Sequence, residues 1–240
     1  SVPEQIVDGS NKYQGVTFID INKDGLVDLL KAKNGTARKV YLNNGTAWRN
    51  VSNTTWVIPV DFVNSSSDDE GIRFLELNGD GLVDIVQGKA SGSIKKSWLN
   101  NGTGWVNTSS WILPDYFVGT AGNDTGLREI DLNNDGLTDL LMGGQPGAAW
   151  LNNGTGWINE TFYAPNLQFT NSTYPDLGVR FMDINGDVLT DILQNFFSNV
   201  SYLNQTCMDQ NGSVQNCTLY SVTNFTNVKI NNGSGWVFSA

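Results

Sequence analysis

Four short loops carry half of the acidic side chains in this chain. Each loop has nine residues, with Asp, Glu or Asn at positions 1, 3, 5 and 9, and three of the four have Gly at position 6. The copies are spaced by 56, 55 and 52 residues and begin at Asp20, Glu76, Asp131 and Asp183. Only oxygen ligands are offered, and flexible sites with several carboxylates favour Ca²⁺ over Mg²⁺. The pattern predicts one calcium site in each loop.

The predicted ligands are the side-chain oxygens at positions 1, 3, 5 and 9 and the backbone carbonyl oxygen at position 7. In chain order they are Asp20, Asn22, Asp24, Leu26 and Asp28; Glu76, Asn78, Asp80, Leu82 and Asp84; Asp131, Asn133, Asp135, Leu137 and Asp139; and Asp183, Asn185, Asp187, Leu189 and Asp191. Position 12 holds no Glu and no helical pattern flanks the loops, so they differ from EF-hands. A series of Asn/Asp/Gly turns without metal is the alternative, and four copies in one register argue against it.

Two loops depart from the shared pattern. Glu76 stands where the other loops have Asp, and its longer side chain either shifts the ion or binds it through both oxygens. Val188 stands in the place of the turn glycine. A β-branched residue is strained at positive φ, so we expect the fourth site to be the weakest or to be distorted.

The overall charge agrees with bound cations. The formal net charge is −10, and the four loops hold 12 of the 24 acidic residues. Three carboxylates within one loop repel one another unless a cation lies between them. We therefore predict that the chain binds three to four Ca²⁺ ions and that chelation lowers its melting temperature.

Each loop is part of a longer repeat. An apolar run precedes every copy, and an Asn-Gly pair between apolar segments follows it, at Asn44, Asn101, Asn153 and Asn232. Asn-Gly is the strongest short signal for a β-hairpin, and no segment has a helical period. Small antiparallel sheets cannot bury their faces alone, so we predict an all-β fold, a β-propeller of four antiparallel blades. We expect one domain, residues 1–240, with repeats at approximately 1–55, 56–110, 111–161 and 162–240, the last carrying an insertion at 199–227.

A further element of the repeat contains Trp, Pro and Phe, at residues 56–62 and 111–117 and in looser form at 162–165. Residues 235–240 stop just before such an element, and residues 1–6 resemble it. We therefore expect N- and C-terminal strands to complete one blade together. That blade forms either within one chain or between neighbouring copies, and the second arrangement would propagate head-to-tail into a filament.

The loops and their flanking strands resemble FG-GAP/VCBS repeats, which build integrin-α-like calcium-binding β-propellers. The family motif is D-x-[DN]-x-D-G-x-x-D, and the four loops match it apart from Glu76 and Val188. The resemblance covers nearly the whole chain. It implies a Ca²⁺ loop between two strands of each blade, an extracellular location, and a role in adhesion, carbohydrate binding or surface assembly. The family more often has seven blades, whereas four repeats are visible here.

Asn-x-Ser/Thr triplets are unusually frequent. Seventeen are present, whereas the Asn, Ser and Thr content gives about five by chance. Turn formation is a sufficient explanation for the six that have Gly in the middle. No turn rule requires Ser or Thr in the other eleven, so we predict N-glycosylation of a secreted surface protein, at Asn50, Asn53, Asn64, Asn107, Asn123, Asn159, Asn171, Asn199, Asn204, Asn216 and Asn224.

The insertion at 199–227 contains both cysteines, Cys207 and Cys217. A disulfide that closes this local loop suits a secreted protein, and a pair of free thiols is the alternative. Five of the triplets lie in the same insertion. We expect a protruding hairpin covered by glycans.

Composition ranks the possible functions. The chain has no histidine, which excludes a His-based acid–base pair or triad, although residue types alone leave a glycosidase-type carboxylate pair open. A sequence pI near 4.3 disfavours nucleic acid as a partner. A membrane-spanning helix needs a run of about 18 apolar residues, and the sequence contains no run of that length. A chain that begins at Ser1 fits a mature, processed product of extracellular or cell-surface location.

We predict a structural or adhesive surface protein without catalytic activity that self-associates head-to-tail. The alternative is a lectin-like module that binds carbohydrate or a surface protein through stacking tryptophans, with Trp56 and Trp111 as candidates. Their regular recurrence favours core positions. The recurring arginines Arg73, Arg128 and Arg180 are expected to pair with loop carboxylates or to pack between blades, and the aspartates before them, Asp8, Asp69, Asp124 and Asp176, to support turns.

Overall fold

The strands of this chain form four antiparallel sheets of four strands each, and every sheet is a meander of consecutive strands. This is seen in a computed structural model, which describes residues 1–52, 54–172, 176–208 and 214–238. Within these ranges the side chains of residues 196–227 and 238 are not described. The prediction of an all-β fold with four antiparallel blades is confirmed.

The strand bounds follow the repeat. Blade one contains β1 (Val16–Ile19), β2 (Asp28–Lys31), β3 (Lys39–Asn43) and β4 (Trp48–Asn50). Blade two contains β5 (Ile72–Leu75), β6 (Asp84–Lys89), β7 (Ile94–Asn100) and β8 (Trp105–Thr108). Blade three contains β9 (Leu127–Ile130), β10 (Asp139–Met142), β11 (Ala148–Asn152) and β12 (Trp157–Asn159), followed by the short 3₁₀ helix η1 (Thr161–Tyr163). Blade four contains β13 (Val179–Met182), β14 (Asp191–Met208), β15 (Val214–Asn231) and β16 (Trp236–Phe238).

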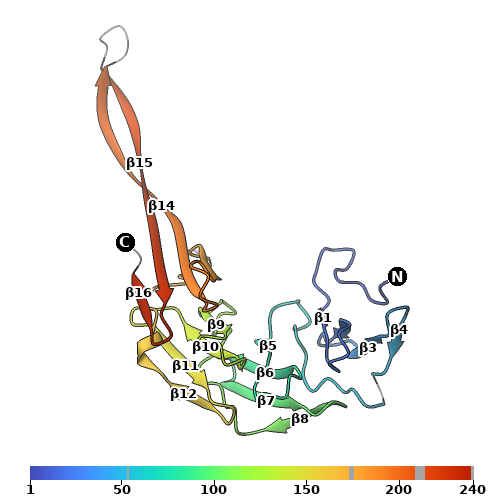
Figure 1. Ribbon diagram of the computed structural model, residues 1–240. Coiled ribbons are helices and arrows are strands. Elements are labelled where there is room, and N and C mark those ends of the chain that lie inside the picture. The colour runs from blue at the N-terminus through green and yellow to red at the C-terminus, as the bar shows by residue number, and fades with distance from the viewer. Residues whose placement is uncertain (53, 173–175, 209–213, 239–240) are drawn as a thin grey trace.

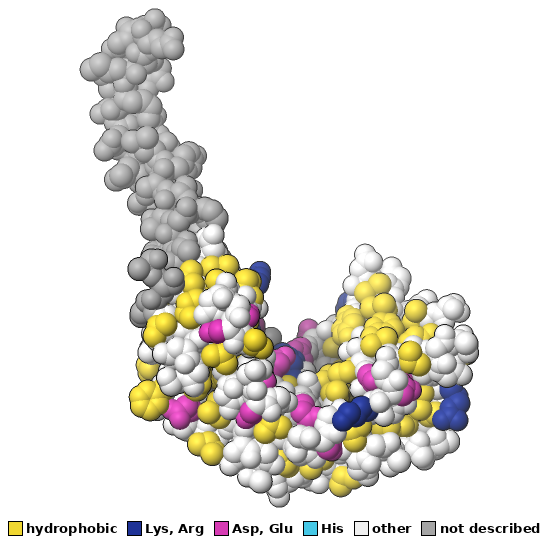
Figure 2. All heavy atoms as spheres, in the orientation of Figure 1, with side chains coloured by type: hydrophobic (Ala, Val, Ile, Leu, Met, Phe, Trp, Pro, Cys, Tyr) yellow, Lys and Arg dark blue, Asp and Glu magenta, His cyan; other side chains and the backbone are white. Residues whose placement is uncertain are grey.

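The four blades follow one another round an arc (Figure 1). Blade one and blade four lie at opposite ends of it, and Figure 2 shows a hollow between them. Among the described residues no sheet combines strands from both ends of the chain. The composite blade expected within one chain is therefore wrong. The physical reason is that residues 1–14 form a linker-like segment with one isolated bridge, Val7 to Tyr13, instead of a sheet strand.

The core lies between successive blades. At the first junction Leu30 and Val40 of blade one pack in one cluster with Ile72 and Ile85 of blade two and with Trp56. Equivalent clusters join blade two to blade three and blade three to blade four. Full burial of an aliphatic side chain contributes about 1.5–3 kcal/mol, so these layers between blades hold the arc together.

The Trp-Pro-Phe segments are linkers that fill these junctions. Trp56 and Trp111 are 3% and 5% exposed, which confirms that they belong to the core. The Phe62 N–H donates to the Ala32 carbonyl oxygen of blade one at 2.9 Å, so the linker is also hydrogen-bonded to the blade before it. Each linker therefore bridges two blades.

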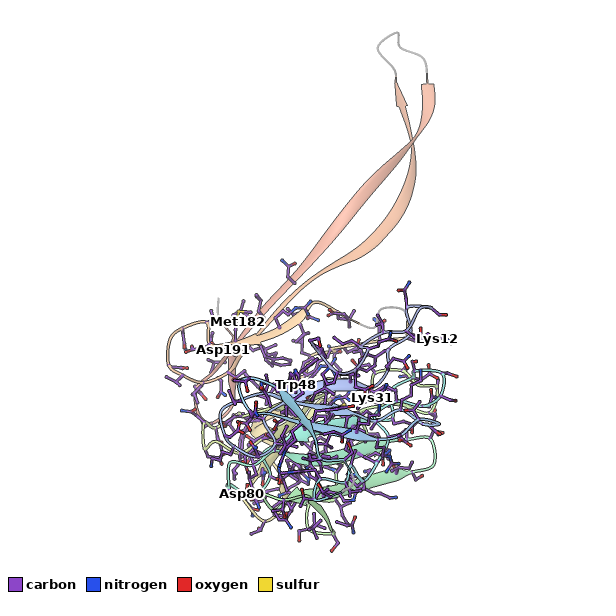
Figure 3. All side chains as sticks on the ribbon, turned by 90° about the vertical axis from the view of Figure 1, so that its right-hand side faces the viewer. Lys12, Lys31, Trp48, Asp80, Met182 and Asp191 are labelled. Carbon is purple, nitrogen blue, oxygen red and sulfur yellow. The ribbon has the colours of Figure 1, made fainter. Side chains whose placement is uncertain are left out.

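The strands β14 and β15 have 18 residues each and continue beyond blade four as a two-stranded ribbon (Figure 1). Asp191, where β14 begins, and Met182 lie at the base of the ribbon (Figure 3). The predicted hairpin in the insertion is present in the backbone. Its register pairs Cys207 with Gln215 and Cys217 with Gln205. The two cysteine side chains lie outside the described residues, so the disulfide stays a prediction.

Candidate functional site

The four acidic loops connect the first and second strands of their blades, where the resemblance places them. Their backbone needs left-handed conformations at position 6, where Gly25, Gly81 and Gly136 have φ of 84°, 76° and 84°. Glycine adopts this conformation without steric cost, which explains its place in the motif.

The carboxylate at position 9 is the buried centre of each loop. It is 0% exposed in all four copies, at Asp28, Asp84, Asp139 and Asp191. In the second loop Asp84 accepts one hydrogen bond from the Leu77 N–H at 3.0 Å and another from the Asn100 N–H at 2.7 Å. The other three aspartates make the same two bonds. Position 9 thus ties the loop to the third strand of its blade.

Positions 1, 3 and 5 close the loop on itself. In the first copy Asp20 accepts hydrogen bonds from the N–H groups of Lys23 and Gly25, both at 2.8 Å. The Asn22 amide donates to the Asp24 carboxylate at 2.9 Å. The same bond between positions 3 and 5 occurs in the other loops at 2.9–3.0 Å. The polar side chains therefore gather around one loop of backbone.

The clustering of like charges is visible in the acidity of the buried aspartates. The pKa of Asp84 is raised to about 7, chiefly by burial and also by the nearby charges of Glu76 and Asp80, against the opposing effect of the hydrogen bonds from the Asn100 and Leu77 N–H groups. Asp139 has its pKa raised to about 7 in the same way. A cation placed in these loops would relieve the repulsion.

The donor set suits Ca²⁺ in its chemistry, because it consists of carboxylate, amide and carbonyl oxygens. The side-chain arrangement is less complete. Among the described residues no group of three or more Asp, Glu, His or Cys side chains is arranged to hold a metal ion. An ionised carboxylate has about four lone-pair sites, so its bonds to N–H groups leave capacity for an ion. The position-3 amide donates to position 5 through its nitrogen, so its oxygen also keeps capacity for an ion.

The backbone of the fourth loop is strained at Val188, as the sequence predicts. Val188 has φ of 71°, so a β-branched residue occupies the left-handed conformation of the missing glycine. Its side chain is 67% exposed. Asp183 and Asn185 are exposed, whereas their counterparts in the first loop are half-buried. The backbone strain is confirmed, and a weaker metal site stays a prediction.

Sequence reasoning missed a buried asparagine that joins the blades. It is the first Asn of each Asn-Asn-Gly turn, and its amide donates to the position-2 carbonyl oxygen in the loop of the preceding blade. The pairs are Asn100 to Ile21 at 2.8 Å, Asn152 to Leu77 at 2.8 Å and Asn231 to Leu132 at 2.7 Å. The Oδ1 of the same Asn accepts the N–H of the turn glycine, as Asn100 does from Gly102 at 2.9 Å, so the constant first Asn was a signal that could have been used.

The N-terminal segment is held by an acidic residue that no motif singled out. Glu4 has a side chain that is 8% exposed, and it accepts hydrogen bonds from Lys31 Nζ at 2.8 Å, Lys39 Nζ at 2.6 Å and the Tyr41 hydroxyl at 2.7 Å. Burial opposes ionisation of Glu4, but these three bonds outweigh it and lower its pKa to about 2. Lys31 lies on blade one (Figure 3).

The recurring arginines pair with the aspartates four residues before them, at 3.1 Å for Arg73–Asp69, 2.7 Å for Arg128–Asp124 and 3.0 Å for Arg180–Asp176. Arg73 also lies 4.9 Å from the ring centre of Phe117 and 3.9 Å from Glu129 of blade three. Asp8 accepts hydrogen bonds from the Ser10 and Lys12 N–H groups. Among the described residues the arginines therefore pair with the aspartates before their strands and not with carboxylates of the acidic loops, and Arg73 shows the expected packing between blades.

The predicted glycosylation sites with described side chains lie at the surface. Asn64 is half-buried, and the exposed ones are Asn50, Asn107, Asn123, Asn159 and Asn171. Asn53 and the side chains of Asn199, Asn204, Asn216 and Asn224 lie outside the described residues. In the Asn-Gly turns the threonine has a structural role, since Thr103 Oγ1 donates to Asn101 Oδ1 at 2.9 Å. Ser52 and Asn50 share such a bond, at 2.6 Å, so a local turn also explains that triplet.

A family model described as FG-GAP-like repeat matches residues 76–142 and 131–193. Residues 76–193 of this chain are FG-GAP-like repeats. Among curated proteins none matches it. In the described residues no helix is long and apolar enough to cross a membrane.

A similar solved structure is that of an Agrocybe aegerita lectin, studied for its specific recognition of non-reducing terminal N-acetylglucosamine. The TM-score is 0.54 at 17% sequence identity, and the match covers 94% of this chain and 64% of the lectin chain. At this identity the likeness establishes a shared β-propeller fold. This chain spans less than two thirds of the length of that lectin.

Proposed function

We propose that this protein is a calcium-stabilised, N-glycosylated structural or adhesive module of the cell surface that self-associates head-to-tail and has no catalytic activity. The observation that carries this is the hydrogen bonding between the acidic loops of the first three blades. Lys23 of the first loop donates to the Asp80 carbonyl oxygen of the second at 2.9 Å. The Thr138 N–H of the third loop donates to the Glu76 carbonyl oxygen of the second at 3.0 Å. Ions bound in these loops would stabilise the three blades together.

A structural role fits the use of the carboxylates. The oxygens of the buried aspartates accept hydrogen bonds from backbone N–H groups of their own blade, as those of Asp84 do. These carboxylates are therefore not accessible to a substrate. Since the chain contains no histidine, the usual general base near neutral pH is missing as well. Exposed glycosylation motifs on several blades support an extracellular location.

The calcium part is tested by thermal unfolding of the glycosylated protein with Ca²⁺, with Mg²⁺ and after chelation. Binding at 100 times the dissociation constant contributes about 2.7 kcal/mol per site, and each kcal/mol raises the melting temperature of a chain this size by about 2–4 °C. Asp135→Asn should reduce the calcium shift, whereas Asp68→Asn, an exposed aspartate outside the loops, should leave it unchanged. Equal melting temperatures with and without Ca²⁺ would overturn the proposal.

The adhesive part is tested with protein-coated beads. Beads that cluster in Ca²⁺ and disperse on chelation support an adhesive module. Beads that stay dispersed under both conditions contradict it. A circular dichroism spectrum of the same protein in solution checks that the protein is folded.

Carbohydrate binding is the second candidate, and it is favoured by the fold shared with a lectin. Two cavities lined by Asn and Asp lie at successive linkers. One measures about 330 Å³ and includes Asn64, Asp69 and Lys89, and the other measures about 400 Å³ and includes Asn123 and Asp124. A glycan array that includes sugars ending in N-acetylglucosamine tests this candidate, and binding weakened by Asp69→Ala would support it. An array without any bound glycan would reject it.

A further inference from the structure

The outer face of blade four exposes apolar residues that are buried in every other blade. We call this surface the tail face and define it by Ile184, Leu193 and Val228. Ile184 is 42% exposed, whereas its equivalents at loop position 2 are each 0% exposed, namely Ile21, Leu77 and Leu132. Leu193 and Val228 are partly exposed. Their equivalents are at most 1% exposed, namely Leu30, Val86 and Leu141 for the first and Val40, Ser97 and Ala149 for the second.

The segment before blade one exposes the complementary set. We call this surface the head face and define it by Val2, Ile6 and Val7. The segment matches the later linkers, because its bridge Val7 to Tyr13 has the spacing of the bridges Val63 to Asp69 and Val118 to Asp124. Val2, Ile6 and Val7 are 49%, 46% and 49% exposed. The matching residues of the linkers are 1–7% exposed, namely Ile58, Phe62 and Val63, and Leu113, Phe117 and Val118.

The polar groups of the two faces are also complementary. At each internal junction an asparagine amide of one blade donates to the position-2 carbonyl oxygen of the blade before it, as Asn100 does to Ile21. Asn43 of blade one donates to the Val27 carbonyl oxygen of its own loop at 3.1 Å, which matches the second bond of Asn100, to the Val83 carbonyl oxygen at 3.2 Å, and among the described residues the counterpart of the bond to Ile21 is missing at Asn43. On the tail face the equivalent acceptor is the carbonyl oxygen of Ile184. One face thus offers the donor and the other the acceptor of a bond that the chain makes three times.

The two faces do not meet within one chain. They belong to opposite ends of the arc, with the hollow between them (Figures 1 and 2). Each face carries one half of a junction whose other half lies on the same polypeptide. A second copy of this chain carries the matching surface.

We propose that the head face of one copy binds the tail face of a second copy in the arrangement of the internal blade junctions. Val2, Ile6 and Val7 pack against Ile184, Leu193 and Val228, and the Asn43 amide of one copy turns to the Ile184 carbonyl oxygen of the other. This contact rests on the self-association in the proposed function and gives it a surface and a direction. It is heterologous, so it leads to a ring or a filament according to the angle between copies.

The test uses three variants of the full glycosylated chain in sedimentation velocity. Ile184→Asp places a charge on the tail face, and Ile6→Asp places one on the head face. Ile158→Asp is the matched control, because Ile158 is also an exposed isoleucine, at 50%, and lies on β12 away from both faces. All three positions are solvent-exposed in the single chain, so the variants should fold, and Val2→Asp is a second head-face variant in case Ile6→Asp does not.

The wild type and Ile158→Asp should assemble, and each face variant alone should dissociate with a dissociation constant raised about 30-fold or more, as for a central interface residue. A mixture of Ile184→Asp and Ile6→Asp should form dimers only, since one intact head meets one intact tail. A monomeric wild type, or face variants that assemble like the control, would overturn the contact.

The same samples separate this inference from the proposed function. If the chain is monomeric but Ca²⁺ still raises its melting temperature, the head-to-tail contact is rejected and the calcium-stabilised module is retained. If Ca²⁺ has no effect on the melting temperature but the chain still assembles through these faces, the calcium role is rejected and the contact is retained.

Discussion

The side-chain amide of Asn152 donates a hydrogen bond to the backbone carbonyl oxygen of Leu77 at 2.8 Å and so joins blade three to blade two. Asn152 is 1% exposed. The side-chain oxygen of Asn152, Oδ1, accepts hydrogen bonds from the Trp111 indole N–H at 3.2 Å and from the Gly154 N–H at 3.0 Å. One side chain therefore satisfies groups from two blades and the linker between them.

Replacing Asn152 by alanine should destabilise the protein by about 2–4 kcal/mol, because it leaves a buried carbonyl and a buried indole without their partner. Asn43→Ala is the matched control, since Asn43 has the same place in blade one and bonds only within that blade. It should cost about 1 kcal/mol. The free energy of unfolding in urea checks both values. Equal losses for the two variants would show that the bond between blades contributes little.

Replacing Val188 by glycine should stabilise the fourth loop. A left-handed conformation costs a residue with a β-carbon about 1–2 kcal/mol, and the greater freedom of glycine in the unfolded chain offsets part of the gain, leaving about 0.5–1 kcal/mol. Val27→Gly, at an exposed valine outside the positive-φ residues of the first loop, should instead destabilise by about 0.5–1 kcal/mol. Hydrogen exchange of the two loops measures the effect. Exchange in the fourth loop that is no slower in Val188→Gly than in the wild type would contradict the prediction.

Glu4 should make docking of the N-terminal segment depend on pH. Its pKa is lowered from 4.5 to about 2 by its hydrogen bonds, so docking is fully supported above pH 4.5, weakens as pH falls below that, and is lost below about pH 2. Glu4→Gln should weaken docking at pH 7 by about 1.5–3 kcal/mol. Heteronuclear NOE values for residues 1–14 follow the segment. A wild type that loosens near pH 6, or a Glu4→Gln variant as ordered as wild type, would contradict this assignment.

Arg73 should contribute more to stability than Arg180. Both pair with an aspartate of their own blade, but Arg73 also lies over Phe117 and reaches Glu129, and its side chain is 29% exposed against 60% for Arg180. Arg73→Ala should therefore cost about 1–2 kcal/mol, and Arg180→Ala should cost less. Thermal melts of the two variants make the comparison. A larger loss at Arg180 would reverse the ranking.

Glycan occupancy should be higher at Asn107, Asn123 and Asn159 than in the Asn-Gly turns. In those turns, as at Asn101, the side-chain oxygen Oδ1 accepts hydrogen bonds from the N–H and the hydroxyl of Thr103. Both side chains that the glycosylation motif requires are therefore already engaged with each other. Glycopeptide mass spectrometry of protein from a secretory host reports occupancy at each site. Full occupancy of the turns with empty sites elsewhere would show that turn geometry does not limit modification, and an unmodified protein would remove the glycoprotein part of the proposal.

The periodic part of the fold could be predicted from the sequence. The position-9 aspartate, the turn glycine and the Asn-Gly hairpin recur at fixed spacing, and each demands one local conformation. The core role of Trp56 followed from its recurrence, and its 3% exposure bears this out. Val188 could be identified as strained because only one residue type suits its backbone.

The remaining features depend on contacts between distant segments. The bond from Asn152 to Leu77 joins residues 75 positions apart, and a single sequence gives no sign of which carbonyl a buried amide will meet. Glu4 has no motif, because its three partners come from two strands of blade one. Of the two composite blades considered, the one within a single chain is absent from the described residues, because an apolar Pro-containing segment fits a linker as well as a strand, and only packing decides between them.

Every junction in this arc uses the same three parts, which are a linker, an apolar layer and one asparagine amide. A blade therefore needs nothing from its neighbours except the surface that all blades share. Copies of the unit could be gained or lost at an end during evolution without a redesign of those that remain, so the number of blades is a variable that such a chain can tune.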